Sequence, residues 1–237
     1  MQAVILAGGK GTRLRPYTTV FPKPLVPVGD VPILEIIIKQ LKKHSFDDIV
    51  ISTGHLAELI EAYFGDGSRW GVHIDYVREY KPLNTAGALG LIDNLRENFL
   101  VMNGDILTTL DYTNLFNFHK EKKGIATISL HKREAKIDYG VIEMTQDFKL
   151  DKYIEKPAYQ FMVSMGVNVL NVRCRDFISK NESIGLPDLM MRMKEEGENI
   201  YCFPSDCYWL DIGRVEDYQV AQDEFEHHRE QFLPDES

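Results

Sequence analysis

The first 29 residues contain four cationic side chains and no Asp or Glu, although the whole chain carries a formal net charge of −9. The cations are Lys10, Arg13, Arg15 and Lys23. A short apolar run at residues 3–6 leads directly into three glycines, Gly8, Gly9 and Gly11. A buried parallel strand that ends in a glycine loop lets backbone N–H groups approach a polyanion, and basic side chains neutralise it. This segment therefore predicts a phosphate-binding loop after the first strand.

Two well-known phosphate loops match this stretch poorly. A P-loop needs Gly-x-x-x-x-Gly-Lys-Ser/Thr, which the three glycines do not supply. A dinucleotide fingerprint needs a third glycine where Thr12 or Leu14 stands, so a nicotinamide-dependent oxidoreductase has only a partial match. Neither alternative accounts for residues 21–28, where three prolines surround Lys23. Because proline fixes the backbone, we expect this lysine to be presented from a stiff loop.

Apolar runs and amphipathic segments alternate along the first 110 residues. We expect strands at 2–6, 48–53, 72–77 and 99–102, and helices at 33–44, 57–64 and 85–95. This βαβαβ order predicts an α/β fold with a Rossmann-like, doubly wound sheet and helices on both faces. Ligands of such sheets bind beyond the carboxyl ends of the strands, where the first loop and Asp105 should meet.

The second half of the chain has a different pattern. Strand-like runs at 125–130, 141–144, 153–154 and 167–172 are joined by short connections, and helical patterns follow at 187–196 and 215–226. Short connections favour antiparallel pairing, so we expect a mixed sheet with a small β subdomain over the mouth of the first half.

Composition narrows the class of protein. With 237 residues, 44% of them apolar, the chain can bury the core of one domain, 1–237. The acidic balance argues against nucleic acid and membrane surfaces as partners. Neither an apolar run of roughly 20 residues nor a signal-peptide pattern is present, and the three cysteines lack Cys-x-x-Cys spacing. We therefore expect a cytoplasmic protein with reduced thiols.

Several motifs then occur in a recognisable order. They are residues 6–16 followed by 21–25, then 82–89, 103–105, 139–141, 155–157 and 209–213. In this order and over nearly the whole chain, they resemble the motifs of the sugar-1-phosphate nucleotidylyltransferases, also called nucleotide-sugar pyrophosphorylases. The resemblance implies an enzyme that makes an NDP-sugar and pyrophosphate from an NTP and a sugar-1-phosphate.

The resemblance also implies roles for individual positions. Arg13 and Lys23 would be catalytic. The nucleotide would be bound by Leu6, Ala7, Gly8, Gly9, Gly11, Thr12, Arg13, Glu79, Asn84 and Gly87. The sugar phosphate would be bound by Asn103, Gly140, Glu155, Lys156, Gly166 and Asn168. Asp105 and Asp211 would hold Mg²⁺. Residues 1–110 would form mainly the NTP-binding half, and 111–213 mainly the sugar-phosphate-binding half with its small sugar-binding β subdomain.

Charge balance supports the expectation of Mg²⁺. An NTP and a sugar phosphate bring about six negative charges together, and each like-charge pair about 4 Å apart repels by about 4 kcal/mol at an effective dielectric near 20. Three or four side-chain cations do not offset this repulsion fully. One or two Mg²⁺ ions held by carboxylates are therefore expected.

The choice of substrates is less constrained. Glu79 favours guanine, because a carboxylate accepts well from two adjacent donors, whereas an amide suits uracil or thymine. The run 85–87 is similar to mannose- and heptose-phosphate guanylyltransferases, but Asn84 and Ser164 depart from common family residues. Uridylyl, thymidylyl or cytidylyl transfer to another sugar-1-phosphate remains an alternative. So does a non-catalytic regulatory subunit that binds a nucleotide sugar.

The C-terminal stretch leaves two structural alternatives open. Residues 214–237 are expected to form a helix and an acidic tail, which either packs on the domain or contributes to a homodimer. We expect no β-helix or acyltransferase extension after this stretch.

Overall fold

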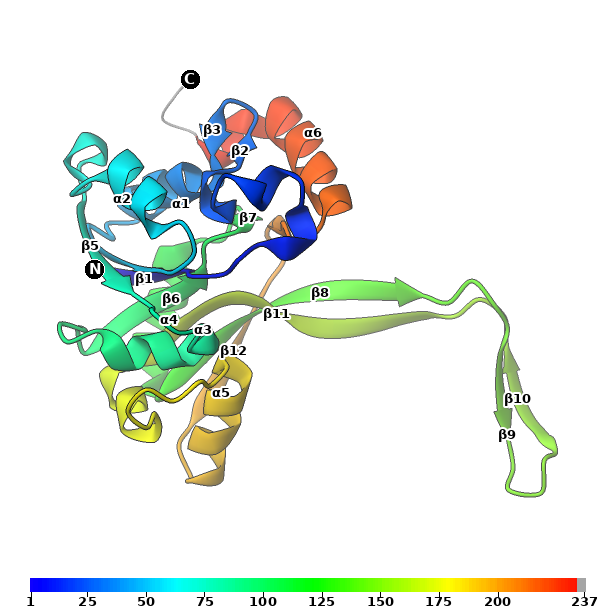
Figure 1. The fold of residues 1–237 in the computed structure, drawn as a ribbon. Helices are drawn as coiled ribbons and strands as arrows, with labels where there is room; N and C mark the ends of the chain where they lie inside the picture. Colours follow the sequence, from blue (N-terminus) through cyan, green and yellow to red (C-terminus); the bar gives the residue numbers. More distant parts are fainter. Residues whose placement is uncertain (234–237) are drawn as a thin grey trace.

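The computed structural model describes residues 1–233, which form a seven-stranded mixed sheet with helices on both faces (Figure 1). The strand order is β12-β8-β11-β6-β1-β4-β5. The strands are β1 (Gln2–Ala7), β4 (Asp48–Thr53), β5 (His73–Arg78), β6 (Asn98–Asn103), β8 (Ala126–Lys136), β11 (Ala158–Asn171) and β12 (Ile200–Ser205). Within this sheet β11 alone runs antiparallel to its neighbours. The expected doubly wound, mixed α/β fold is confirmed.

The interior strand β1 explains why this half of the sheet is parallel. Five of its six residues are buried, and it pairs in parallel with β4 on one side and β6 on the other. Strands covered on both faces read as continuous apolar runs, as residues 3–6 do. The side chains of Ala3 and Ile5 enter one core cluster and that of Val4 the other, as the period-2 alternation of a strand requires.

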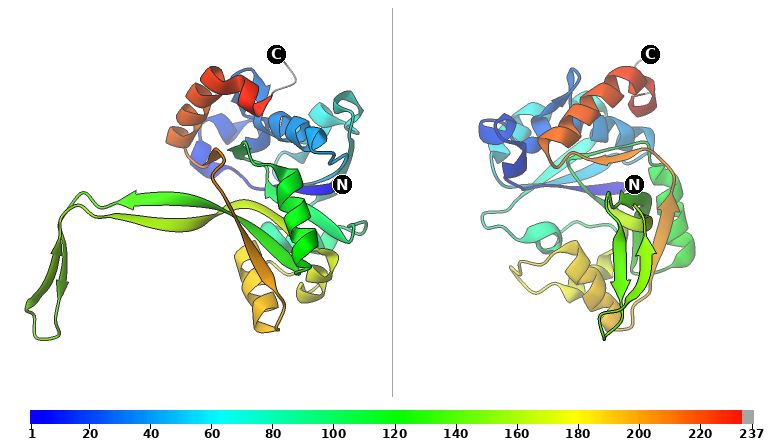
Figure 2. Two further views of the ribbon diagram at one scale, coloured as in Figure 1. Left: turned by 180° about the vertical axis from the view of Figure 1, so that it is seen from behind. Right: turned by 90° about the vertical axis from the view of Figure 1, so that its right-hand side faces the viewer.

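Helices cover the two faces unequally (Figure 2). Those on the larger core are α1 (Ile33–Lys43), α2 (Ala57–Phe64), α4 (Tyr112–Lys122) and α6 (Val215–Phe232). The smaller core lies under α3 (Asn84–Gly87) and α5 (Leu186–Glu195). The first loop and the turn after β6 lie at the carboxyl end of the sheet, where both line the candidate site.

Three features differ from the expectations. A continuous helix at 85–95 was wrong, because α3 ends at Gly87 and a 3-10 turn, Ala88–Leu91, follows. Its two glycines weaken a helix, and the backbone at Gly87 packs against the carbonyl of Glu182. Helix α4 and edge strand β12 were not predicted. The Asp111 side chain, which accepts from Asn114 N at 2.9 Å, is the cap that marks the start of α4.

Strands β8 and β11 extend beyond the sheet as a long two-stranded ribbon, which ends in a hairpin of β9 (Val141–Met144) and β10 (Leu150–Ile154) (Figure 1). We call residues 131–163 the arm. The expectation that this portion lies over the mouth of the first sheet was wrong, because the arm projects away from the body. The ladder from His131–Val163 to Lys136–Ala158 is continuous, which keeps the ribbon extended.

Two short pairings complete the body. β7 (Ile106–Thr108) pairs with β13 (Trp209–Asp211), and β2 (Pro27–Val28) pairs with β3 (Val31–Pro32). Helix α6 packs on the domain through buried Phe225 and Phe232, so its described part matches the packed-helix alternative. The rest of the expected acidic tail, residues 234–237, lies outside the described residues. None of the helices in residues 1–233 is long and apolar enough to cross a membrane.

His119 on α4 is a buried histidine held between two polar partners. Its Nδ1 lies 2.9 Å from Thr127 Oγ1, and its Nε2 lies 3.1 Å from Asn98 Oδ1. Burial lowers its pKa from 6.5 to about 4, because the charged imidazolium would lose its hydration. The native state therefore holds this imidazole neutral well below the pH at which the unfolded chain protonates it.

We expect this histidine to make stability fall with acid. Below pH 6.5 the unfolded chain binds a proton that the native state does not, so unfolding becomes easier down to about pH 4. Between pH 7.5 and 5, the free energy of unfolding should fall by about 2 kcal/mol more for the wild type than for His119→Gln. Urea denaturation of both proteins measures the difference. Equal falls would contradict the buried neutral imidazole.

Candidate active site

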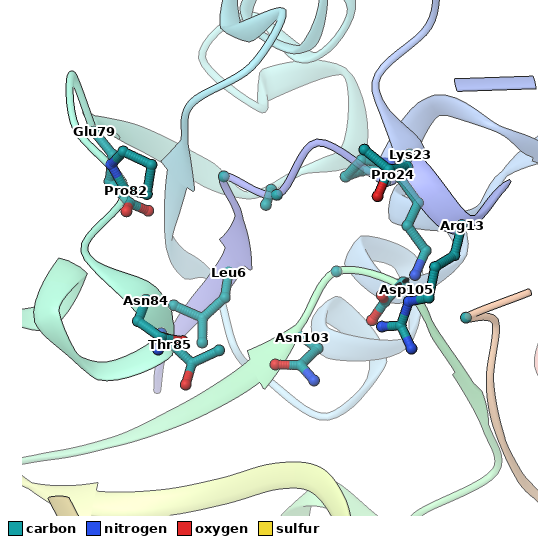
Figure 3. A pocket seen from close by; sticks show the side chains of 17 residues that line it. Leu6, Arg13, Lys23, Pro24, Glu79, Pro82, Asn84, Thr85, Asn103 and Asp105 are labelled. Atoms are coloured by element: carbon teal, nitrogen blue, oxygen red, sulfur yellow. Dashed lines mark hydrogen bonds and ion pairs between the residues drawn. The ribbon is translucent and has the colours of Figure 1, made fainter. Parts of the chain in front are cut away.

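A pocket of about 400 Å³ opens at the carboxyl ends of β1 and β6 (Figure 3). In Figure 3, Arg13, Lys23 and Asp105 lie at one end of it and Glu79 at the other, with Leu6 between them. The lining residues are Leu6, Ala7, Gly8, Gly9, Gly11, Thr12, Arg13, Lys23, Pro24, Glu79, Pro82, Asn84, Thr85, Asn103, Gly104, Asp105 and Gly213.

Contacts with Gly54 and Thr18 hold the glycine loop in place. A Cβ on Gly54 would lie 2.7 Å from the backbone oxygen of Gly8, so β4 leaves room for the loop only because residue 54 is glycine. Gly11 has φ +60°, and its carbonyl accepts a 2.7 Å hydrogen bond from Thr18 Oγ1. These contacts fix the loop with its backbone facing the pocket.

An ion pair joins the two walls at the charged end. Lys23 begins the 3-10 turn Lys23–Leu25 directly after Pro22, and its Nζ contacts Asp105 Oδ2. Both side chains are largely shielded, with 13% of Lys23 and 21% of Asp105 exposed. The other carboxylate oxygen, Asp105 Oδ1, is buried and has no hydrogen-bond partner among the described residues. An unpartnered buried carboxylate oxygen of this kind suits a metal ligand.

The pairing of β7 with β13 brings Asp211 next to this pair. Asp211 lies opposite Ile106, and Ile212 N donates to Asp105 O at 3.0 Å. Loss of solvation and then the Asp105 carboxylate raise the pKa of Asp211, while Lys23 and Arg13 lower it. Asp211 faces a neighbouring cavity of about 460 Å³, lined by Arg13, His131, Arg133, Trp209, Leu210, Asp211, Gly213, Arg214 and Asp217.

The carboxylates fit Mg²⁺ as a shared ligand better than a metal enclosed by protein. In residues 1–233, no group of three His, Cys, Asp or Glu side chains could hold a metal ion. Mg²⁺ commonly takes one or two carboxylates and completes its shell with water and substrate phosphates. Asp105 and Asp211 supply that number of carboxylates beside the glycine loop.

The far end of the pocket is polar and preorganised. Glu79 Oε1 accepts from Ser52 Oγ at 2.7 Å, and Oε2 accepts from Leu83 N at 3.1 Å. These bonds hold the carboxylate against the glycine loop, where a Cβ on Gly8 would lie 2.6 Å from Glu79 Oε1. A carboxylate keeps further acceptor sites after two hydrogen bonds. Glu79 can therefore still accept from a ligand.

Most of the residues singled out from the sequence lie together in this pocket. Twelve line it: Leu6, Ala7, Gly8, Gly9, Gly11, Thr12, Arg13, Lys23, Glu79, Asn84, Asn103 and Asp105. Gly87 lies behind the wall, where a Cβ would be 2.2 Å from the Glu182 carbonyl oxygen. Gly166 has φ +70° and lies against the side chain of Asn103, and Asn168 is buried in β11.

Three of the residues singled out for the sugar phosphate are placed elsewhere. Gly140, Glu155 and Lys156 lie on the arm, away from the pocket of their own chain (Figure 1). The structure therefore brings the nucleotide set, except Gly87, together with Asp105 and places Asp211 at the neighbouring cavity, but it does not bring in this part of the sugar-phosphate set.

Sequence reasoning missed Ser52, which orients Glu79, and Arg133 and Arg214, which line the cavity beside Asp211. Ser52 could have been noticed as a polar residue near the carboxyl end of an apolar strand. The two arginines carry no comparable signal, because isolated arginines are usually solvated.

Comparison with known proteins places the chain in a family. The family model described as nucleotidyl transferase matches residues 2–228, so the chain belongs to that family, as the sequence motifs predicted. It is 37% identical to a UTP–glucose-1-phosphate uridylyltransferase of Synechocystis, with 93% of this chain matching 62% of that protein. It is 32% identical to a D-glycero-alpha-D-manno-heptose 1-phosphate guanylyltransferase of Aneurinibacillus thermoaerophilus, over 96% of this chain and 100% of that protein.

A solved structure shares the fold. HddC from Yersinia pseudotuberculosis superposes with a TM-score of 0.73 and 25% identity, over 94% of this chain and 99% of that one. Among the two relatives named above, the chain spans about three fifths of the length of the Synechocystis uridylyltransferase and the full length of the Aneurinibacillus guanylyltransferase.

The contact between Gly54 and the glycine loop gives a prediction. A methyl group at Gly54 must push against the Gly8 backbone, which cannot rotate away as a side chain could. We expect Gly54→Ala to weaken nucleotide binding about tenfold or more and to cost about 1–3 kcal/mol of stability. The matched control is Gly90→Ala, whose Cβ would make an ordinary 3.5 Å contact with Ile178. Calorimetric titration that finds both variants unchanged would contradict the role assigned to the loop.

Proposed function

We propose that this protein transfers a nucleotidyl group from an NTP to a sugar-1-phosphate and releases pyrophosphate. The observation that carries the proposal is the meeting of the glycine loop, Arg13, Lys23 and Asp105 in one pocket at the carboxyl edge of the sheet. Loop N–H groups and two cations suit a triphosphate, and a shielded carboxylate beside them suits its metal. The names of the relatives support the same reaction class.

The reaction asks mainly for alignment and charge stabilisation. An oxygen of the sugar-1-phosphate attacks the α-phosphorus in line, a P–O bond forms, and the bond to the leaving pyrophosphate breaks with its electron pair. The nucleophile is already an anion near neutral pH, because the second pKa of a phosphate monoester is about 6. No general base is needed. Lys23 contacts the phosphates at the reacting centre, and Arg13 stabilises the leaving pyrophosphate.

Mg²⁺ is the cofactor that the carboxylates would hold, with Asp105 and Asp211 as its protein ligands. When bound, it would neutralise phosphate charge at the reacting centre. The Lys23 ammonium pairs with Oδ2 of Asp105, and Oδ1 is buried without a hydrogen-bond partner among the described residues.

The sugar phosphate would lie on the side of the charged end that Gly166 and Asn103 border. Asn103 and Gly166 are in contact there, and Asn168, two residues after Gly166, is buried in β11. Glu155 would accept from sugar hydroxyls, Lys156 would bind the sugar phosphate, and the backbone at Gly140 would line the sugar. These last three residues can act only if an arm reaches a pocket.

Glu79 supports a choice of nucleobase. Its carboxylate lies at the polar end of the pocket and is oriented by Ser52 and Leu83 N. Guanine presents N1–H and N2–H₂ side by side, which matches two carboxylate oxygens. We therefore favour GTP with mannose- or heptose-1-phosphate, acting in the cytoplasm. The relative matched over its full length is also named as a guanylyltransferase.

A substrate grid tests the function. We expect pyrophosphate release with Mg²⁺ when GTP is combined with mannose- or heptose-1-phosphate, among GTP, CTP, UTP, dTTP and ATP crossed with four sugar-1-phosphates. Lys23→Ala should slow release about 100-fold or more, an effect much larger than its loss of stability, because Lys23 acts on the reacting phosphates. Glu79→Gln should lower the preference for GTP over UTP, since an amide pairs donor with acceptor.

Two results would overturn the proposal. Binding of nucleotide sugars without turnover anywhere in the grid would favour the regulatory subunit. Inactivation of Lys23→Ala that matches its loss of stability would make Lys23 a structural lysine.

A further inference from the structure

The arm is a two-stranded ribbon that lacks the packing surface such a ribbon needs for stability. Beyond the His131–Val163 pair, where β12 also ends against β8, strands β8 and β11 pair only with each other in the described chain (Figure 2). Five steps of about 3.3 Å carry this ladder roughly 17 Å before the β9–β10 hairpin begins. A two-stranded ribbon without a packed face is marginally stable in water. Its extension into solvent therefore indicates that another surface covers it.

The arm also carries most of the large apolar side chains that are exposed in residues 1–233. Ten of the 18 large apolar side chains exposed in residues 1–233 lie on it. They are Ile137, Tyr139, Ile142, Met144, Phe148, Leu150, Tyr153, Tyr159, Phe161 and Met162. Exposed apolar residues concentrated in this way mark an interaction surface.

The charges of the arm indicate what kind of partner covers it. Residues 131–163 contain six Lys or Arg and six Asp or Glu, so the arm is neutral in a chain of net charge −9. Several of these charges pair within the arm, as Lys152 does with Glu143 at 2.7 Å. A neutral arm is not repelled by a second acidic copy of the chain, and it lacks the basic face that nucleic acid or an anionic membrane requires.

The pocket rim offers a complementary surface. Tyr80 follows the lining residue Glu79 and is 89% exposed, and Val20 and Phe21, 65 and 55% exposed, precede the lining residue Lys23 by three and two positions. Exposed apolar side chains thus lie near the pocket, while Glu155 and Lys156 of the same chain lie far from it on the arm. The arm of a second copy would supply both these two residues and an apolar surface that covers the pocket.

We propose that two copies of the chain exchange arms, so that the arm of each protomer covers the pocket of its partner. This inference rests on the proposed function for the roles of Glu155 and Lys156. In the exchanged dimer these two residues complete the sugar-phosphate end of the partner's pocket. The contact is reciprocal, as a two-fold dimer requires. Exchange leaves the β8–β11 ladder intact, whereas folding back onto the same chain would bend it near Gly166 and break its hydrogen bonds.

A mixed dimer tests the exchange. One chain carries Lys23→Ala and the other Lys156→Ala, each with its own tag, and the mixed dimer is purified from co-expression through both tags. Each parent dimer should lose at least about tenfold in turnover, because each site lacks one cation. The mixed dimer should regain about half of the wild-type rate, because one of its two sites combines an intact pocket with an intact arm. A mixed dimer no more active than its parents would overturn the proposal.

Oligomeric state gives a readout that does not depend on turnover. Size-exclusion chromatography with light scattering should show that the wild-type protein is a dimer at micromolar concentration. Met144→Lys combined with Leu150→Glu should give monomers, because it adds charge to the apolar face while the cross-strand pair keeps opposite charges. Met191→Lys, at a side chain 52% exposed on α5, is the control and should remain dimeric. A monomeric wild type, or a dimeric arm variant, would overturn the exchange. A wild-type dimer without any turnover would instead overturn the proposed function.

Discussion

The ion pair between Lys23 and Asp105 is the interaction on which the site depends. It joins a proline-fixed loop near the N-terminus to the turn after β6, across 82 residues of sequence. Both groups are mostly shielded from water, so removal of either would leave an uncompensated charge. The pair therefore positions the two walls of the pocket before a ligand arrives. It uses one oxygen of Asp105, and the other has no hydrogen-bond partner among the described residues.

In the proposed function, the two ends of the pocket have different roles. The charged end gathers cations, loop N–H groups and carboxylates around the place where phosphorus chemistry would occur. The Glu79 end is separated from that chemistry and is oriented by Ser52. Under the proposed function, changes at the Glu79 end would alter which nucleotide is bound without altering how the phosphates react. This division suits a family whose relatives carry different bases and sugars in their names.

Local sequence patterns predicted the body of the protein well, because each of these patterns is compatible with only one local structure. The apolar run before Gly8 can be buried on both faces only as a central parallel strand, and the polar residues after β1 and β6 then meet at one edge. The arm was predicted only as strands. The hydrogen bonds between β9 and β10 form equally well whether the arm lies over the pocket or points away from it. The sequence therefore does not specify the direction of the arm. Arg133 was missed because only the path of β8 in the folded protein places it in the same cavity as Asp211.

Metal-dependent nucleotide binding tests the central claim about the charged end most directly. Wild type and Asp105→Asn are titrated calorimetrically with the nucleotide that supports turnover, in Mg²⁺ and in EDTA. If Asp105 is the metal ligand, Mg²⁺ strengthens binding to the wild type by about tenfold or more, and this gain is lost in Asp105→Asn. An equal gain in both proteins would contradict the account and leave the Lys23–Asp105 pair a purely structural contact.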